Sequence, residues 1–260
     1  MQALLKAIAM MDMPTDAQRI FHGRGGLHPD CEHLALDVYP PVWVLTSFQP
    51  LEESPLATLS TALTARLQTL APDQALNWVY QCRSEGRSDT RLMAGSVPEP
   101  HVVTESGTRF GVHVLKGQNH GLFLDMALGR HWVRDHIAAN PGGKVLNLFA
   151  YTCAFSVVAM QAGARQVTNL DMSHGALAIG QQNHALNGIA AGAGFLAHDI
   201  FTTWGKITRG GPYDLIILDP PSYQKGSFVA TKDYARLMRR LPDLLNTGGH
   251  ALLCLNAPEL

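Results

Sequence analysis

This sequence has few cysteines, no long apolar run and almost no net charge. Its 260 residues include four cysteines that are far apart and form no CxxC pair, which argues against a disulfide framework and favours a reducing compartment. No apolar run reaches the roughly 18 residues of a membrane span, and the first residues lack the basic flank and apolar run of a signal peptide. We therefore expect a cytoplasmic protein without membrane attachment.

The formal net charge is only −1, so overall electrostatics do not indicate a nucleic-acid partner. The charges are nevertheless uneven: residues 1–110 contain 8 Lys/Arg and 12 Asp/Glu, whereas residues 111–260 contain 12 and 9. The densest basic stretch comprises Lys225, Lys232, Arg236, Arg239 and Arg240. On a helix the last four share one face, opposite an apolar one. Two interpretations stay open: a solvated helix face or a contact with phosphate.

Residues 1–110 carry no strong motif, but their pattern predicts a small α+β module. Alternating apolar residues indicate strands at 34–38 and 42–45, and Ser54-Pro55 begins a helix with a leucine stripe. Further predicted elements are a short helix over residues 3–11 and strands over 76–81, 101–104 and 109–114. We assign this module to residues 1–110.

Strands and helices alternate in residues 111–260. After a helix that begins near Asp125 and ends at 140–143, the predicted strands are 144–149, 166–171, 194–197, 213–218 and 249–255. The predicted helices are 154–163, 173–187 and 231–245. Nearly continuous apolar strands in this alternation indicate an α/β, Rossmann-like parallel sheet that is covered on both faces. No internal repeat interrupts the pattern.

The loop after the first of these strands, residues 149–155, has no glycine, which argues against a GxGxxG site and hence against NAD or FAD. Asp171 ends the second strand, where an acid binds ribose hydroxyls, although a helix N-cap explains Asp171 or Ser173 equally well. S-adenosylmethionine has no phosphate and needs no such glycine loop. The rigid run Asp219-Pro220-Pro221-Ser222-Tyr223 suits a flat substrate, because its backbone is fixed and Tyr223 offers a stacking face.

From about residue 121 to 256, these motifs resemble bacterial class I methyltransferases that make 5-methylcytosine or 7-methylguanine in 23S ribosomal RNA. The matching segments are Gly121-Leu122-Phe123-Leu124-Asp125 with Arg130, the run 147–152, Asp171-Met172-Ser173, Asn187-Gly188 and the run 219–223. The resemblance implies that residues 149–153 hold the methionine part of the cofactor, Asp171 the ribose and Asp199 the adenine. It also implies that residues 219–223 face the target base.

The resemblance thus predicts an S-adenosylmethionine-dependent methyltransferase that acts on a base in RNA, with 23S rRNA as the expected partner and no metal. The implied catalytic residues are Asp219, Pro220, Pro221 and Tyr223. The implied cofactor-binding residues are Asp125, Arg130, Asn147, Phe149, Ala150, Tyr151, Thr152, Cys153, Asp171, Met172, Ser173, Asp199, Ile200 and Asp219.

The sequence departs from the family pattern at several points. Cys153 stands where the family has glycine, and Ala127 stands where it has arginine. The 5-methylcytosine enzymes carry a cysteine nucleophile at the position that aligns with Asn256, and Cys254 lies two residues, or about 7 Å, before it. We expect Cys254 to be a buried core thiol, and Asn256 favours the 7-methylguanine branch and transfer to nitrogen. The resemblance also implies a helix and two more strands after the fifth strand, so we expect an incomplete domain with an exposed sheet edge.

Two other functions remain open from the sequence. One is a methyltransferase of a small molecule or a protein, because the charge is nearly neutral and no RNA-binding module is recognised. The other is a non-catalytic protein that keeps the fold. The oligomeric state is left open. The spacing of His28, Cys31 and His33 matches no standard zinc pattern, and the segment 22–26 is either a phosphate contact or a surface loop.

Overall fold

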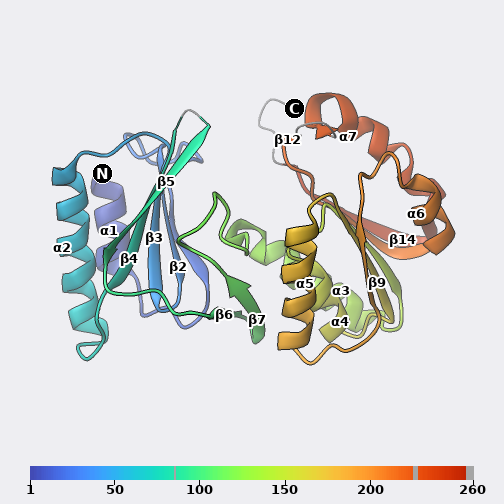
Figure 1. Cartoon of the computed structure of the whole chain (residues 1–260), viewed down its shortest axis with the longest axis horizontal. Coiled ribbons are helices and arrows are strands. Elements are labelled where there is room, and N and C mark those ends of the chain that lie inside the picture. The colour runs from blue at the N-terminus through green and yellow to red at the C-terminus, as the bar shows by residue number, and fades with distance from the viewer. Residues whose placement is uncertain (85, 225–227, 256–260) are drawn as a thin grey trace. The chain divides into compact units, whose positions relative to one another are not determined.

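The computed structural model describes residues 1–84, 86–224 and 228–255 (Figure 1). The chain divides into two compact units, Met1–Asp125 and Met126–Leu260. The sequence-based division into domains at 110/111 stays a prediction. We describe each unit by itself.

The first unit is built on a five-stranded sheet in the order β1-β2-β3-β4-β5. Strands β3 and β4 are parallel, and the other neighbours are antiparallel. A separate antiparallel hairpin is formed by β6 and β7. The bounds are α1 Gln2–Met10, β1 Gln18–His22, β2 Leu34–Tyr39, β3 Val42–Ser47, α2 Glu53–Leu70, β4 Asn77–Ser84, β5 Arg87–Ala94, β6 His101–Glu105 and β7 Thr108–Val112.

One face of this sheet packs against α1 and α2. The α2 stripe of Leu56, Leu59 and Leu63 is buried together with Leu36 and Leu45 from the strands. Because these residues recur at helical and strand spacing, the sequence predicted the elements that carry them, and those predictions are confirmed. Strands β1 and β5 were missed, since QRIFH and RSDTRLMA show no apolar alternation; both are formed through pairing with β2 and β4.

The second unit contains a five-stranded parallel sheet in the order β10-β9-β8-β11-β14. Its strands are β8 Lys144–Leu148, β9 Gln166–Asp171, β10 Ala193–Ala197, β11 Tyr213–Leu218 and β14 Leu245–Leu253, with a two-residue hairpin of β12 Tyr223–Gln224 and β13 Phe228–Val229. Its helices are α3 Ala127–Ala139, α4 Ala154–Gln161, α5 His174–Leu186, α6 Trp204–Gly210 and α7 Ala230–Met238. Short 3-10 turns occupy Leu124–Met126 and Leu241–Asp243.

Helices cover both faces of the parallel sheet. Val145 and Ile217 face α3 and α4, whereas Leu146 and Ile216 face α6 and α7. The predicted α/β, Rossmann-like fold is therefore confirmed. All five strands of the parallel sheet were predicted, whereas the hairpin strands β12 and β13 were missed. The helix predicted over 231–245 is wrong at its end: α7 stops at Met238, a 3-10 turn follows at Pro242, and β14 already begins at Leu245. Helix α6 was missed.

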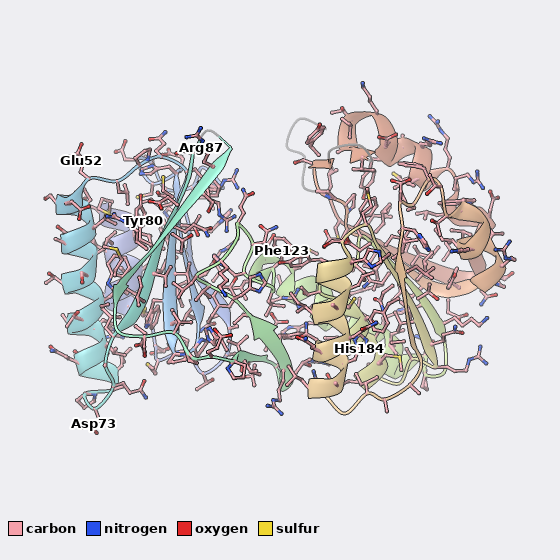
Figure 2. All side chains as sticks on the ribbon, in the orientation of Figure 1. Glu52, Asp73, Tyr80, Arg87, Phe123 and His184 are labelled. Atoms are coloured by element: carbon pink, nitrogen blue, oxygen red, sulfur yellow. The ribbon has the colours of Figure 1, made fainter. Side chains whose placement is uncertain are left out.

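Buried polar side chains connect β8 and β9 to α4 and α5. Asn147 Nδ2 donates to Asn169 Oδ1 at 2.9 Å, and Asn169 Nδ2 donates to Ser156 Oγ at 2.9 Å. Ser156 Oγ lies 2.9 Å from Nε2 of His184, whose Nδ1 is 2.7 Å from the Gly180 carbonyl (Figure 2 labels His184 on α5). These contacts can form together only when β8, β9, α4 and α5 take one position relative to one another. They therefore fix how the two strands and the two helices pack beneath the loops.

Within the described ranges, no helix is both long enough and apolar enough to cross a membrane. The same residues contain no group of three or more His, Cys, Asp or Glu side chains arranged to hold a metal ion.

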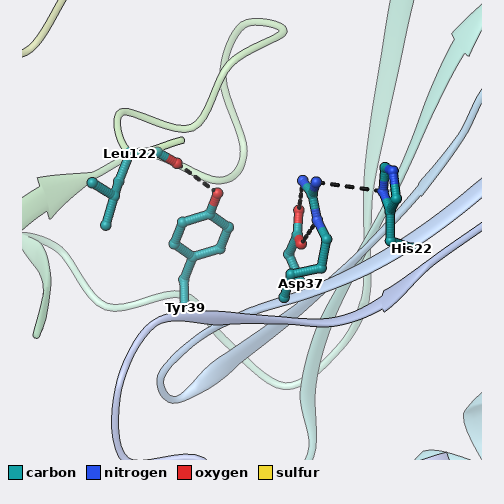
Figure 3. A network of polar contacts seen from close by, with 5 residues as sticks. His22, Asp37, Tyr39 and Leu122 are labelled. Carbon is teal, nitrogen blue, oxygen red and sulfur yellow. Dashed lines mark hydrogen bonds and ion pairs between the residues drawn. The ribbon is translucent and has the colours of Figure 1, made fainter. Parts of the chain in front are cut away.

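On the other face of the first sheet, polar side chains form a network (Figure 3). Arg19 pairs with the buried Asp37 at 2.8 Å, and the Tyr39 hydroxyl donates to the Leu122 carbonyl at 3.0 Å. The ring of His120 contacts Tyr39 edge-on and is only 4% exposed. Within the described ranges, neither His120 ring nitrogen has a hydrogen-bond partner. Burial, with a smaller contribution from Arg83, lowers the pKa of His120 to about 4.

This burial predicts acid-sensitive stability. In the unfolded chain His120 binds a proton near pH 6.5, but in the folded chain it does so only near pH 4. The contribution of His120 to the free energy of unfolding is therefore fully present above about pH 6.5 and is lost as the pH falls toward 4. At about pH 5 the loss should be about 2 kcal/mol. Urea unfolding of the wild type and of His120→Phe at about pH 7.5 and 5 measures this loss of unfolding free energy. The His120→Phe variant should lose less than the wild type, because it lacks the titrating ring. Equal losses in the two proteins would contradict this assignment.

Candidate functional site

The carboxyl ends of the parallel strands bring four loops to one edge of the sheet. Leu148 at the end of β8 pairs with Leu170 of β9 and with Leu218 of β11, and Leu196 of β10 also pairs with Leu170. The segments that follow these residues are therefore neighbours. They are the predicted site segments 149–153, 171–173, 198–200 and 219–223, and in open α/β sheets ligands bind at this edge.

The loop after β8 has an unusual backbone. Phe149, Tyr151 and Cys153 have φ of 58°, 47° and 62°, a left-handed conformation that costs a residue other than glycine roughly 1–2 kcal/mol. Three hydrogen bonds hold it: Ala150 N to Leu170 O at 3.0 Å, Tyr151 N to Asp171 Oδ2 at 2.8 Å and Cys153 N to Ala150 O at 2.7 Å. Strained backbone of this kind is maintained where a site must be pre-formed.

Asp171 links the first two loops. Its Oδ2 accepts from Tyr151 N, and its Oδ1 accepts from Ser173 N, each at 2.8 Å. Ser173 in turn caps α5 by accepting from Ala176 N at 3.1 Å. The N-cap interpretation is thus confirmed for Ser173. A carboxylate has about four acceptor positions, so these two bonds leave the Asp171 oxygens capacity to accept further donors.

Cys153 is turned into the interior rather than toward the loops. Its side chain is fully buried, and a Cβ added at Gly180 of α5 would lie only 2.5 Å from its Sγ. Burial, together with the charge of Asp171, raises the pKa of the thiol, which therefore stays protonated at neutral pH. Cys153 stands where the resemblance predicts glycine, and the absence of a side chain at Gly180 of α5 leaves room for its sulfur in the interior.

The remaining loops present polar groups from β10 and β11. Asp199 Oδ1 accepts from Phe201 N at 2.9 Å and from Thr202 N at 3.2 Å, and Ile200 beside it is buried. Pro220 is buried, whereas Tyr223 is 63% exposed. The first strand of the hairpin, β12, begins at Tyr223.

A direct contact joins the first loop to the hairpin. The Phe149 ring meets the Phe228 ring edge-on, with 5.1 Å between centroids, and Tyr223 pairs with Val229 in the same hairpin. Phe228 was missed from the sequence, because its partner lies about eighty residues away. The loop after β8 and the diproline segment are therefore neighbours, and their joint site stays a prediction.

Other predicted site residues lie outside these loops. Asn147 is buried within β8 and bonds to Asn169, and the buried Arg130 of α3 lies over the Phe155 ring at 5.9 Å. Asp125 is exposed and is the last residue of the first unit. Cofactor-binding roles for them stay predictions. Asn256 and Lys225 fall outside the described residues. Cys254 is 8% exposed, which confirms the expected buried thiol.

A five-stranded parallel sheet with helices on both faces and polar loops at the carboxyl ends of its strands defines a Rossmann-like α/β protein, a class that binds its ligands at this edge. The model of the S-adenosylmethionine-dependent methyltransferase family matches residues 18–260, and the chain belongs to this family. The predicted family and cofactor are therefore confirmed. The branch that makes 7-methylguanine is not resolved.

Curated relatives carry ribosomal RNA methyltransferase names. The chain is 37% identical to "Ribosomal RNA large subunit methyltransferase K/L" of Psychrobacter sp. (strain PRwf-1), over 66% of this chain and 22% of the relative. It is 33% identical to "Ribosomal RNA large subunit methyltransferase I" of Aeromonas salmonicida (strain A449), over 72% of this chain and 49% of the relative. The chain thus matches half or less of the length of these proteins.

A solved structure shows the same architecture with a ligand. It is a putative methyltransferase complexed with SAH, 26% identical to this chain, with a TM-score of 0.74. The match covers 94% of this chain and 62% of that one.

The Cys153–Gly180 contact predicts strong coupling between two substitutions. Gly180→Ala should destabilise the chain by about 1–3 kcal/mol, because its methyl group would overpack against Sγ. In a Cys153→Gly background the same change should cost little, because the sulfur is gone. Unfolding free energies of the four proteins form the cycle, with an expected coupling above about 1 kcal/mol.

Gly175→Ala is the matched control in the same helix, because its Cβ would meet only Ser173 Oγ at 3.9 Å. It should be tolerated in both backgrounds. An equal cost of Gly180→Ala with and without Cys153 would show that the two residues are not coupled.

Proposed function

We propose that this chain transfers a methyl group from S-adenosylmethionine to a base in ribosomal RNA, with 23S rRNA as the substrate. The observation that carries the proposal is the Phe149–Phe228 contact, which joins the strained cofactor loop to the hairpin that begins at the exposed Tyr223. The relatives' names supply the substrate class, since both are large-subunit ribosomal RNA methyltransferases. A substrate of this kind is consistent with a cytoplasmic enzyme.

The residues at the sheet edge suit the cofactor by their chemistry. Asp171 would accept hydrogen bonds from the ribose hydroxyls, and Asp199 would meet the adenine. The backbone of residues 149–153 would hold the methionine part. The glycine-free loop offers no cradle for a pyrophosphate, and S-adenosylmethionine has none. Arg130 of α3 would complete the site from outside these loops.

When bound, S-adenosylmethionine supplies an electrophilic methyl carbon on a sulfonium. The chain's own contribution is positioning, which can account for much of the rate when the reacting atoms are held in line. Tyr223 would stack on the target base, and Asp219 together with the Pro220 carbonyl would orient its polar edge. Pro220 and Pro221 restrict the backbone here, so little reorganisation would accompany substrate binding.

We place the transfer at nitrogen. Carbon methylation of a pyrimidine by way of a covalent intermediate needs an accessible thiolate. Cys31, Cys153 and Cys254 are buried, and Cys82 lies on β4 in the first sheet. A ring nitrogen, by contrast, uses its own lone pair to form the new C–N bond as the C–S bond breaks, and a neutral thioether leaves.

Methyl transfer from labelled cofactor tests the proposal. The purified chain is incubated with ribosomal RNA from cells that lack the protein, and the RNA is digested to nucleosides. We expect one labelled purine nucleoside. Labelled 5-methylcytosine would overturn the assignment to nitrogen, and label only in protein or small molecules would overturn the RNA substrate.

Substitution of the exposed tyrosine separates the base site from the cofactor site. Tyr223→Ala should lower kcat/KM for RNA by about 5- to 150-fold, because an aromatic–base stack contributes about 1–3 kcal/mol. Affinity for S-adenosylmethionine, measured by calorimetry, should not change. Tyr223→Phe keeps the ring and should restore most of the activity. An unchanged rate in Tyr223→Ala would remove this residue from the base site.

A further inference from the structure

Six exposed basic side chains lie on α6, on α7 and in the turn that follows α7. We call this set the α6–α7 basic surface. It consists of Lys206, Arg209, Lys232, Arg236, Arg239 and Arg240. The acidic residues of the same helices and turn are Asp233 and Asp243, and their ion pairs with Arg236 and Arg240 are long, at 4.0 and 3.7 Å. Exposed pairs of this kind contribute little, so the surface keeps a positive charge.

The guanidinium groups of two of the arginines lie over aromatic rings. The guanidinium carbon of Arg236 lies 4.2 Å from the centroid of the Phe201 ring, and that of Arg240 lies 4.5 Å from the Trp204 ring. The contact with the ring restricts each guanidinium, and its N–H groups can still donate to phosphate oxygens in pairs. Cations on a helix face that is simply solvated would point into water and make no such contacts with aromatic rings.

The surface is fixed beside the proposed base site. Ala230 N at the start of α7 donates to Ser222 O at 3.0 Å, and the Tyr234 hydroxyl donates to Cys254 O at 2.9 Å (Figure 1 shows α7 close to β12). Ala230, Tyr234 and Leu237 are buried, so the opposite side of α7 carries its cations. Helix α7 thus begins beside the diproline segment and carries Arg236.

We propose that the α6–α7 basic surface binds the phosphate backbone of the RNA strand that carries the target base, and that the arginine–aromatic stacks pre-organise it. This inference rests on the proposed function. Among polyanions, RNA fits best, because the cations continue from the hairpin where a base would stack and would contact neighbouring phosphates of the same strand.

The test measures binding of a fluorescein-labelled single-stranded RNA by fluorescence anisotropy over a range of salt concentrations. The variant Lys206→Gln/Lys232→Gln/Arg239→Gln removes three charges that make no cation–π stack. We expect at least a tenfold weaker affinity at low salt. The slope of log affinity against log salt should fall by about 2, because each lost phosphate contact to single-stranded RNA removes about 0.7.

A matched control removes three exposed charges elsewhere. Lys6→Gln/Arg87→Gln/Arg165→Gln takes them from α1, from the tip of the β4–β5 hairpin (Figure 2) and from the residue before β9. Arg165 precedes the amino end of its strand, opposite the loops. This protein has the same net charge as the test variant and should keep the wild-type slope. Equal losses in both triple variants would overturn the inference.

A second variant tests the stacks without changing charge. Arg236→Lys/Arg240→Lys should keep the salt slope but weaken affinity about threefold, because a lysine cannot stack and donate in the same plane. Wild-type affinity in this variant would overturn the pre-organising role. Binding of the chain to anionic phosphatidylserine vesicles but not to RNA would overturn the assignment of the surface to RNA.

The same measurements distinguish failure of the inference from failure of the proposed function. A wild-type protein that binds S-adenosylmethionine but shows no salt-dependent affinity for RNA would contradict both. If the wild type binds and methylates RNA while the α6–α7 triple variant binds it equally well, the inference alone is overturned.

Discussion

The site depends on one hydrogen bond, which the Tyr151 backbone N–H donates to the carboxylate of Asp171 at 2.8 Å. It joins the loop after β8 to the end of β9 and, together with the bonds donated by Ala150 N and Cys153 N, holds three residues other than glycine in left-handed conformations. Those conformations would relax in an isolated peptide, because each costs about 1–2 kcal/mol. The parallel pairing of β8 with β9 keeps donor and acceptor together, so the fold maintains the loop geometry.

Other features adapt to this loop. Cys153 occupies a position that favours glycine, and Gly180 in α5 leaves the space for its sulfur. Phe149, which the turn directs toward the β11 side, meets Phe228, and the hairpin of Phe228 leads into α7. A single backbone constraint therefore connects the proposed cofactor loop, the base-facing hairpin and the basic helix that follows it.

Much of this was predictable from local pattern. Strand β11, with its apolar run ending at Asp219, and α2, with its leucine stripe, have periodicities that hydrophobic burial explains directly. Strands β1 and β5 were not predictable, because pairing partners rather than their own side chains fix them. The Cys153–Gly180 and Phe149–Phe228 contacts were also missed, since each joins residues about 27 or 79 positions apart and leaves no periodic signal.

A crystal structure of this chain with S-adenosylhomocysteine tests the central claim most directly. The account predicts positive φ at Phe149, Tyr151 and Cys153, an intact bond from Tyr151 N to Asp171, and the ligand at the carboxyl ends of β8 and β9. A ligand bound elsewhere, or a loop that abandons these conformations when the ligand binds, would contradict it.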